Sequence, residues 1–233
     1  MNARCPRILS TCLAAALWLG SMHAHGAILL ATSFDSLTIS GATMEDVVWT
    51  TENGLTGTTD LTASTNLFTN GAAAAANGFF SVNQNINGST MGSPAWSTTW
   101  TITVGASDIQ LDDITLFSVE HNSGGVLGAG NGTTVINLQI VDNNTTGTIA
   151  NQTLDKDISN ATPEELTYDF GGSPLTLTAA NTYDVTFTLW EESSSGNFEA
   201  FTEVSFNGDA IPEPSALALT GLAGLLLLRR SRC

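Results

Sequence analysis

Basic side chains are almost missing from the sequence, and the few present lie mostly at its ends. Lysine and arginine make up only 6 of the 233 residues, against 22 aspartates and glutamates. Between Ala27 and Asp209 the chain has 21 acids and a single base, Lys156. Binding to phosphate backbones needs clustered lysines and arginines, so this composition excludes a nucleic-acid-binding function. Mutual repulsion among the carboxylates favours a soluble monomer, although clustered carboxylates are also ligands that calcium prefers.

Cysteine is equally scarce. The three cysteines are Cys5, Cys12 and Cys233, all outside residues 27–209. The central part of the chain therefore has no disulfide, zinc–thiolate site or cysteine nucleophile. Its length is enough to bury a full hydrophobic core without such covalent links.

Motifs of catalytic chemistry are also missing. The sequence has no G-x-S-x-G elbow, HExxH helix or glycine-rich phosphate loop. His121 is the only histidine between residues 27 and 209, and a serine triad would have to be assembled around it from Glu120 and nearby serines. Sequence neighbours at a strand end are poor evidence for triad geometry, so we predict that His121 is an ordinary loop residue. Adjacent acids such as Asp112 and Asp113 point to opposite faces of a strand, so such a pair does not by itself form the carboxylate dyad of a glycosidase. We therefore predict a protein without catalytic activity.

The first 26 residues have the pattern of a secretory signal peptide. Arg4 and Arg7 form a positive segment, and an apolar run follows from residue 8 to residue 20. Ala24 and Gly26 supply the small residues that a signal peptidase reads. We predict export with cleavage after Gly26, with cleavage after Ala24 as the alternative.

A second targeting pattern occupies residues 210–233. Pro212-Glu213-Pro214 precedes an apolar run from residue 216 to residue 228, and Arg229, Arg230 and Arg232 follow it. As a helix this run is about 20 Å long, shorter than a hydrocarbon core of about 30 Å. Local thinning of the bilayer permits a short transmembrane helix, and the arginines are expected to stay on the cytoplasmic side.

These three parts, in this order and behind a signal peptide, resemble the PEP-CTERM sorting signal of Gram-negative bacteria. The resemblance covers only residues 211–233. It implies that an exosortase of the inner membrane recognises the tail and cuts near Pro212-Glu213-Pro214, so that the protein is first anchored in the inner membrane and then reaches the cell surface or the extracellular matrix. A simple anchor that is never cut remains the alternative. The family shares its sorting signal and not its exported domain, so the resemblance implies nothing about residues 27–209.

Residues 27–209 have the alternation of apolar and polar residues that is typical of β-strands. The clearest segments are 95–105, 133–141, 182–189 and 197–207, with Phe198, Ala200, Val204 and Phe206 expected on one face of the last. Further strands are expected at 28–33, 37–40, 47–51, 78–83, 109–120 and 166–170.

We therefore predict an all-β domain, an antiparallel two-sheet sandwich with a jelly-roll-like topology. Only two short helices are expected outside the terminal signals, one around residues 72–76 and one after Thr162-Pro163-Glu164-Glu165. The last two strands, 183–190 and 198–206, are expected to form a hairpin that leads into the sorting signal.

Two functions remain open for this domain. The first is an exported non-enzymatic surface or matrix protein, and the alternative is a carbohydrate-binding module that recognises extracellular polysaccharide. No cofactor is expected, with calcium dependence of the binding module as the alternative. Trp96 and Trp100 share a face with apolar residues and are expected in the core, whereas Trp190 alternates away from Leu189 and is the candidate ligand-binding platform. No metal site is identified, because the aspartates near expected strand ends have no EF-hand spacing; they are Asp108, Asp112, Asp113, Asp142, Asp155 and Asp157.

Overall fold

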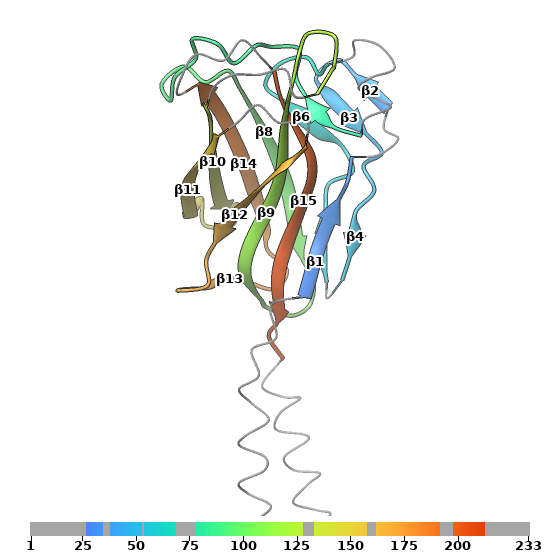
Figure 1. Cartoon of the computed structure of the whole chain (residues 1–233). Coiled ribbons are helices and arrows are strands. Elements are labelled where there is room, and N and C mark those ends of the chain that lie inside the picture. The colour runs from blue at the N-terminus through green and yellow to red at the C-terminus, as the bar shows by residue number, and fades with distance from the viewer. Residues whose placement is uncertain are drawn as a thin grey trace, which may run out of the picture.

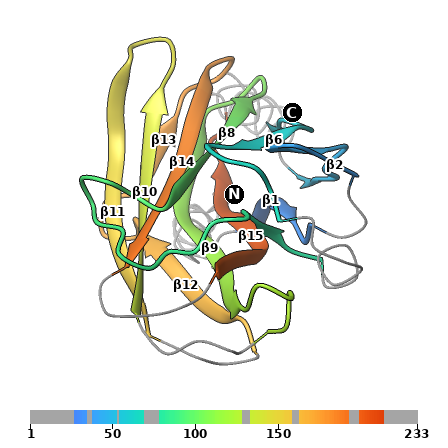
Figure 2. The same ribbon diagram turned by 90° about the horizontal axis from the view of Figure 1, so that it is seen from above.

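The computed structural model describes residues 27–34, 38–52, 54–68, 78–127, 133–157, 162–191 and 198–212. These residues form two antiparallel sheets packed face to face, as Figures 1 and 2 show, and none of them is helical. The all-β two-sheet sandwich predicted from the sequence is therefore confirmed.

The seven-stranded sheet has β9 and β15 at its centre. Its strand order is β12-β9-β15-β1-β4, with β13 also paired to β9 and β7 also paired to β15. The bounds are β1 Ala27–Thr32, β4 Thr50–Thr51, β7 Phe80–Ser81, β9 Ile109–His121, β12 Glu164–Asp169, β13 Leu175–Leu177 and β15 Phe198–Ala210.

The eight-stranded sheet has the order β11-β10-β14-β8-β6-β3-β2, with β5 also paired to β8. The bounds are β2 Thr38–Ser40, β3 Thr43–Glu45, β5 Leu55–Gly57, β6 Leu61–Ala63, β8 Trp96–Val104, β10 Thr133–Asp142, β11 Gly147–Asp157 and β14 Thr182–Glu191. From β8 onward the chain crosses repeatedly between the two sheets.

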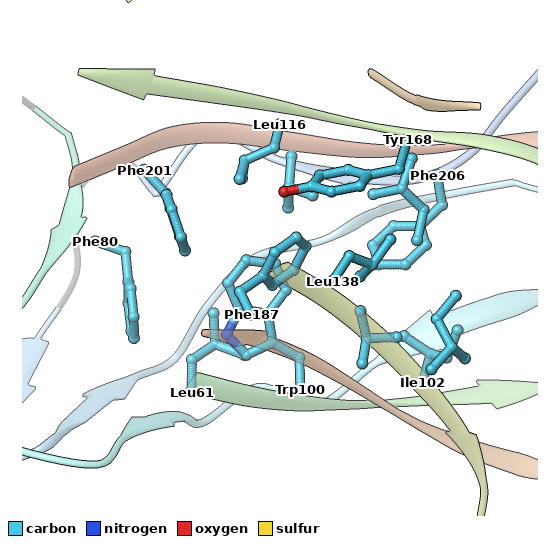
Figure 3. Packing of buried hydrophobic residues seen from close by; sticks show 14 of the residues in the cluster. Leu61, Phe80, Trp100, Ile102, Leu116, Leu138, Tyr168, Phe187, Phe201 and Phe206 are labelled. Atoms are coloured by element: carbon cyan, nitrogen blue, oxygen red, sulfur yellow. The ribbon is translucent and has the colours of Figure 1, made fainter. Parts of the chain in front are cut away.

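The core lies between the sheets because alternate residues of the long strands point inward. Phe187 of β14 is at its centre, with its ring 4.8 Å from that of Trp100 and 5.6 Å from that of Phe201 in the other sheet (Figure 3). Trp96 and Trp100 are buried, as predicted. Tyr168 of β12 donates a hydrogen bond to the Ile136 carbonyl of β10 at 3.0 Å, and burial raises the pKa of this phenol.

A β-bulge in β15 corrects the predicted face of that strand. Phe201 pairs with Ser118 and Glu203 pairs with Phe117, so Thr202 is an extra residue with no opposite residue in the β9 ladder. Phe201 consequently faces the inter-sheet core with Val204 and Phe206, whereas Ala200 packs in a separate cluster. The prediction that Ala200 shares a face with Val204 and Phe206 is wrong.

Two further predictions are corrected by the strand pairing. The segment after Thr162-Pro163 is a strand, since β12 pairs with β9 from Glu164 to Asp169. The last two strands form no hairpin, because β14 lies between β10 and β8 whereas β15 lies in the other sheet, between β9 and β1.

Several sequence-based predictions lie outside the described residues. These are the expected helix at 72–76, the signal-peptide positions Ala24 and Gly26, and most of the sorting signal, namely Glu213, Pro214, Arg229, Arg230 and Arg232. Pro212 is described and is exposed just beyond β15. Within the described part of the chain, no helix has the length and apolar character needed to cross a membrane.

Candidate functional site

The outer surface of the eight-stranded sheet carries an ordered array of polar side chains. Because Val185, Phe187 and Leu189 are buried in the core, the alternate residues of β14 face outward. The same alternation holds in β8 and β10, and it extends into β11. We call this surface the polar face; its residues on β8, β10, β11 and β14 are Ser97, Thr99, Thr101, Thr103, Val135, Asn137, Gln139, Val141, Thr148, Asn151, Thr153, Asp155, Asp184, Thr186, Thr188 and Trp190.

Hydrogen bonds between neighbouring strands hold many of these side chains in place. Asn137 Nδ2 donates to Asn151 Oδ1 at 2.7 Å and to Thr153 Oγ1 at 2.9 Å. Thr99 and Thr186 share a hydrogen bond of 2.9 Å between their hydroxyl oxygens. Asn137 Nδ2 also donates to the Gln152 carbonyl at 3.1 Å, so both of its hydrogens are used within the array, whereas Asn137 Oδ1 and Asn151 Nδ2 take no part in these bonds. The polar face is therefore prepared to bind a ligand rich in hydroxyl groups without first ordering its own side chains.

Asp184 is also engaged within this array. Its Oδ1 accepts from Thr101 Oγ1 at 2.7 Å and from Asn143 Nδ2 at 3.0 Å. Asp155 is the other acid of the polar face, and it is exposed on β11 near the edge of the sheet.

Trp190 lies at one end of the polar face and is half-buried. It is directly opposite Val135 in the β10–β14 ladder, and Val135 is opposite Asp155 in the β10–β11 ladder. The outward-facing Val135 is nevertheless only 5% exposed. Trp190 and Val135 thus form an apolar spot at one end of the polar face, and the exposed carboxylate of Asp155 follows Val135 in the same row.

The other three tryptophans of residues 27–209 point into the fold. Trp96 and Trp100 belong to the core, and Trp49 packs against it with its ring 6.2 Å from that of Trp100. Trp49 Nε1 donates to the Thr58 carbonyl at 2.7 Å, so its polar end is satisfied internally. Trp190 is the only one of the four on the polar face.

A cleft of about 470 Å³ adjoins the polar face at the edge strand β11. One wall is the β11 segment 149–152, which includes Asn151 of the polar face, and the other is the turn between β12 and β13. Gln152 Nε2 donates to the Asp169 carbonyl at 3.0 Å and links the edges of the two sheets beside the cleft. This cleft was not predicted, because the alternation of apolar residues did not indicate β11 as a strand.

His121 takes a different place from the predicted loop. It is the last residue of β9 and is fully buried, with its ring stacked on Phe79 at 5.0 Å and on Phe198 at 5.3 Å. Its Nε2 lies 2.8 Å from Ser81 Oγ and its Nδ1 lies 2.8 Å from the Asn122 carbonyl. A carbonyl only accepts, so we assign the proton to Nδ1, and burial lowers the pKa of the imidazole.

This arrangement does not form the triad considered from the sequence. The partner of Nδ1 is a backbone carbonyl, where a serine hydrolase has a carboxylate. Glu120 precedes His121 in the same strand and therefore faces the opposite side of the sheet. It lies opposite Glu199 in the β9–β15 ladder, and both glutamates are fully buried.

Three of the six aspartates considered as calcium ligands accept hydrogen bonds from other residues of the domain. Asp108 Oδ1 accepts from the Ala179 amide at 2.7 Å, Asp113 Oδ1 from Asn207 Nδ2 at 2.6 Å, and Asp142 Oδ1 from the Asn144 amide at 2.8 Å. Among the described residues, no three histidine, cysteine or acidic side chains gather in a way that would hold a metal ion. Calcium binding stays a prediction without an assigned ligand set.

Comparison with known proteins identifies no family. No protein-family model matches the sequence, and no curated protein matches it. Among solved structures, the chain is similar to TmCBM61 in complex with beta-1,4-galactotriose, with 8% identity over 76% of this chain and 92% of that one and a TM-score of 0.33. It is also similar to the isomalto-dextranase of Arthrobacter globiformis T6 complexed with panose, with 11% identity, 78% and 33% coverage and a TM-score of 0.36.

A third similar structure is the Clostridium thermocellum xylanase 10B, in its CBM22-1–GH10 modules complexed with xylohexaose. The identity is 13%, the coverage is 80% of this chain and 29% of that one, and the TM-score is 0.28. This chain spans about a third or less of the isomalto-dextranase and xylanase chains. Likeness at this level supports no conclusion about ligand or activity, so the function has to be argued from the polar face itself.

Proposed function

We propose that the β-sandwich is a carbohydrate-binding module of an exported protein without catalytic activity, and that its polar face is the binding surface. The observation that carries the proposal is the position of Trp190. It alone among the four tryptophans lies on the outer surface of the eight-stranded sheet, at the end of ladders of asparagine, glutamine and threonine.

The chemistry of the surface fits a sugar chain. The face of an indole is a broad apolar surface, and the C–H groups of a pyranose ring pack against such a surface. The hydroxyl groups of the following sugars are both donors and acceptors, so they match the Asn137 Oδ1 acceptor and the Asn151 Nδ2 donor. An ordered sheet surface of this kind suits an extended polysaccharide, whereas a small metabolite is usually enclosed in a concave apolar pocket.

The proposal includes the route by which the domain reaches its ligand. Residues 1–26 direct export and are removed by signal peptidase, and residues 210–233 anchor the protein in the inner membrane until an exosortase processes the PEP-CTERM signal. The repeated crossing of the chain between the two sheets supports a jelly-roll classification. Extracellular polysaccharide is the partner that both the surface and this route favour.

Affinity electrophoresis in gels containing neutral polysaccharides tests the binding function. The wild-type protein is expected to be retarded by at least one of them, and Trp190→Ala is expected to remove the retardation. Phe117→Ala is the matched control, because Phe117 is a half-buried aromatic residue on the outer face of the other sheet. Equal loss of binding in both variants, or no retardation of the wild type on a broad set of glycans, overturns the proposal.

A further inference from the structure

The charge of the domain argues against one class of polysaccharide. Between Ala27 and Asp209 the chain has 21 acids, one lysine and no arginine. Recognition of uronate or sulfate groups relies on arginine or lysine to balance their charge. A polyanion brought to this domain meets repulsion without a surrounding cationic surface, so anionic polysaccharides are disfavoured as ligands.

The position of Asp155 favours a positively charged ligand over a neutral one. Asp184 already accepts hydrogen bonds from Thr101 and Asn143, whereas Asp155 is exposed and is the acid in the same cross-strand row as Trp190. One strand, β10, separates Trp190 from Asp155, so their backbones are about 10 Å apart at two inter-strand spacings. An amino group on a sugar stacked on the indole, or on the next sugar along the row, comes within reach of that carboxylate.

We propose that the ligand of the polar face is an amine-bearing polysaccharide, a polymer of hexosamine units with free, protonated amino groups. This inference rests on the proposed carbohydrate-binding function and adds the charge of the ligand. Trp190 contributes the stacking surface, the amides and hydroxyls of the ladders bind the sugar hydroxyls, and Asp155 pairs with the ammonium group. The net negative charge of the domain attracts the polymer over a longer range, and this part of the attraction is screened by salt.

The expected preference for an amine-bearing sugar over its N-acetylated form is modest, because Asp155 is exposed. An exposed ion pair changes an equilibrium constant by about two- to fivefold. We therefore expect the full-length protein to bind a glucosamine oligomer about two- to fivefold more tightly than the N-acetylglucosamine oligomer of the same length at low salt. The difference is expected to disappear at high ionic strength, whereas stacking on Trp190 is expected to remain.

Calorimetric titration of the full-length chain, in a detergent without a sugar headgroup, tests this inference. The probes are three oligomers of equal length: glucosamine, N-acetylglucosamine and a uronic acid. Asp155→Asn is expected to lower the ratio of the affinities for the first two oligomers by more than the removal of one charge elsewhere on the domain does. Glu203→Gln is the matched control, since Glu203 is an exposed acid opposite Phe117 on the other sheet, and it is expected to keep the preference.

The outcomes separate the two proposals. The inference is refuted, and the proposed function is left standing, if Trp190-dependent binding of the neutral oligomer comes with no preference for the amine. The same holds if Asp155→Asn lowers the preference no more than Glu203→Gln does. Tighter binding of the uronic acid oligomer also refutes it. If none of the three oligomers nor any other glycan binds, the proposed function itself fails.

Discussion

Gly208 gives the sharpest test of the fold, because it lies where three central strands meet. It pairs with Leu111 of β9 on one side and with Ala27 of β1 on the other. Next to it the register shifts, since Asn207 pairs with Asp113 and Gly208 with Leu111. The extra residue, Asp112, uses its carbonyl to accept from the Phe170 amide at 2.7 Å.

A methyl group does not fit at this position. A Cβ built on Gly208 lies 2.0 Å from the Gln110 carbonyl oxygen and 3.0 Å from the Leu111 Cα. Both atoms belong to the backbone, so no side chain can turn aside, and β9 and β15 must separate locally. Overpacking of a well-packed site costs about 1–3 kcal/mol, and we expect Gly208→Ala to reach about 3 kcal/mol because ladder hydrogen bonds are also weakened. For a domain of this size that corresponds to a fall in Tm of about 6–12 °C.

The measurement is urea-induced unfolding of the 27–212 fragment, followed by circular dichroism and tryptophan fluorescence. Gly172→Ala is the matched control, since a Cβ at Gly172 meets no atom within 4 Å. That variant is expected to stay within about 0.5 kcal/mol of the wild type. If Gly208→Ala unfolds at the same urea concentration as Gly172→Ala, the described register between β9 and β15 is wrong.

Four further predictions concern the domain and its sorting signal. The 27–212 fragment is expected to fold alone with a β-type far-UV spectrum, and a helix-dominated spectrum contradicts this. Phe187→Ala is expected to lower the free energy of unfolding by about 3–5 kcal/mol in urea titrations, because the ring fills the centre of the core; a loss below about 1 kcal/mol contradicts the packing. The pKa of His121 is lower in the folded state than in the unfolded one, so the contribution of the neutral imidazole to stability is complete above pH 6.5 and is lost as the pH falls below that value. His121→Gln is therefore expected to reduce the difference between the free energies of unfolding measured in urea at pH 7.5 and at pH 5.5. An unchanged difference contradicts this prediction. Replacing Arg229, Arg230 and Arg232 by serine is expected to weaken both retention and processing of an epitope-tagged chain in cell fractionation; equal release of the uncut chain with and without an exosortase contradicts the sorting proposal.

Much of the sandwich was predictable because strand periodicity is a local property. Alternation in β8 and β14 placed Trp100 and Phe187 inward, and their burial needs no knowledge of their partners. The edge strand β11 was missed because its apolar residues are few, with Ile149 and Leu154 only partly buried against the core. Such a strand is stabilised by pairing with β10 along its length, which no local pattern announces.

The errors share a different cause, which is tertiary pairing. The Thr162-Pro163-Glu164-Glu165 segment has the composition of a helix start, yet pairing with β9 extends it as β12. Two consecutive strands with a short connection suggest a hairpin, but β14 and β15 belong to different sheets. Apolar alternation within each strand is the same whether the two strands pair with each other or face each other across the core, so the sequence pattern does not distinguish the two arrangements. Thr202 interrupts the apolar–polar alternation of β15, so an irregularity there could be seen in the sequence. The sheet face on which Ala200 lies depends on the pairing of β15 with β9, which the sequence does not show.

Of the candidate site, only Trp190 could be predicted from the sequence, because the residues around it come from other strands. Trp190 was identified because it breaks the composition of its own strand, following Leu189 on the opposite side of the sheet. Trp190, Val135 and Asp155 lie side by side on the three strands β14, β10 and β11. This arrangement depends on the register of β14 against β10 and on the register of β10 against β11. A one-residue slip of β11 against β10 would turn Asp155 into the core and bring Leu154 to the surface. The pairing with β10 that holds β11 in register therefore also determines which charge a ligand on Trp190 meets. This links the stability of the edge strand to the specificity of the polar face.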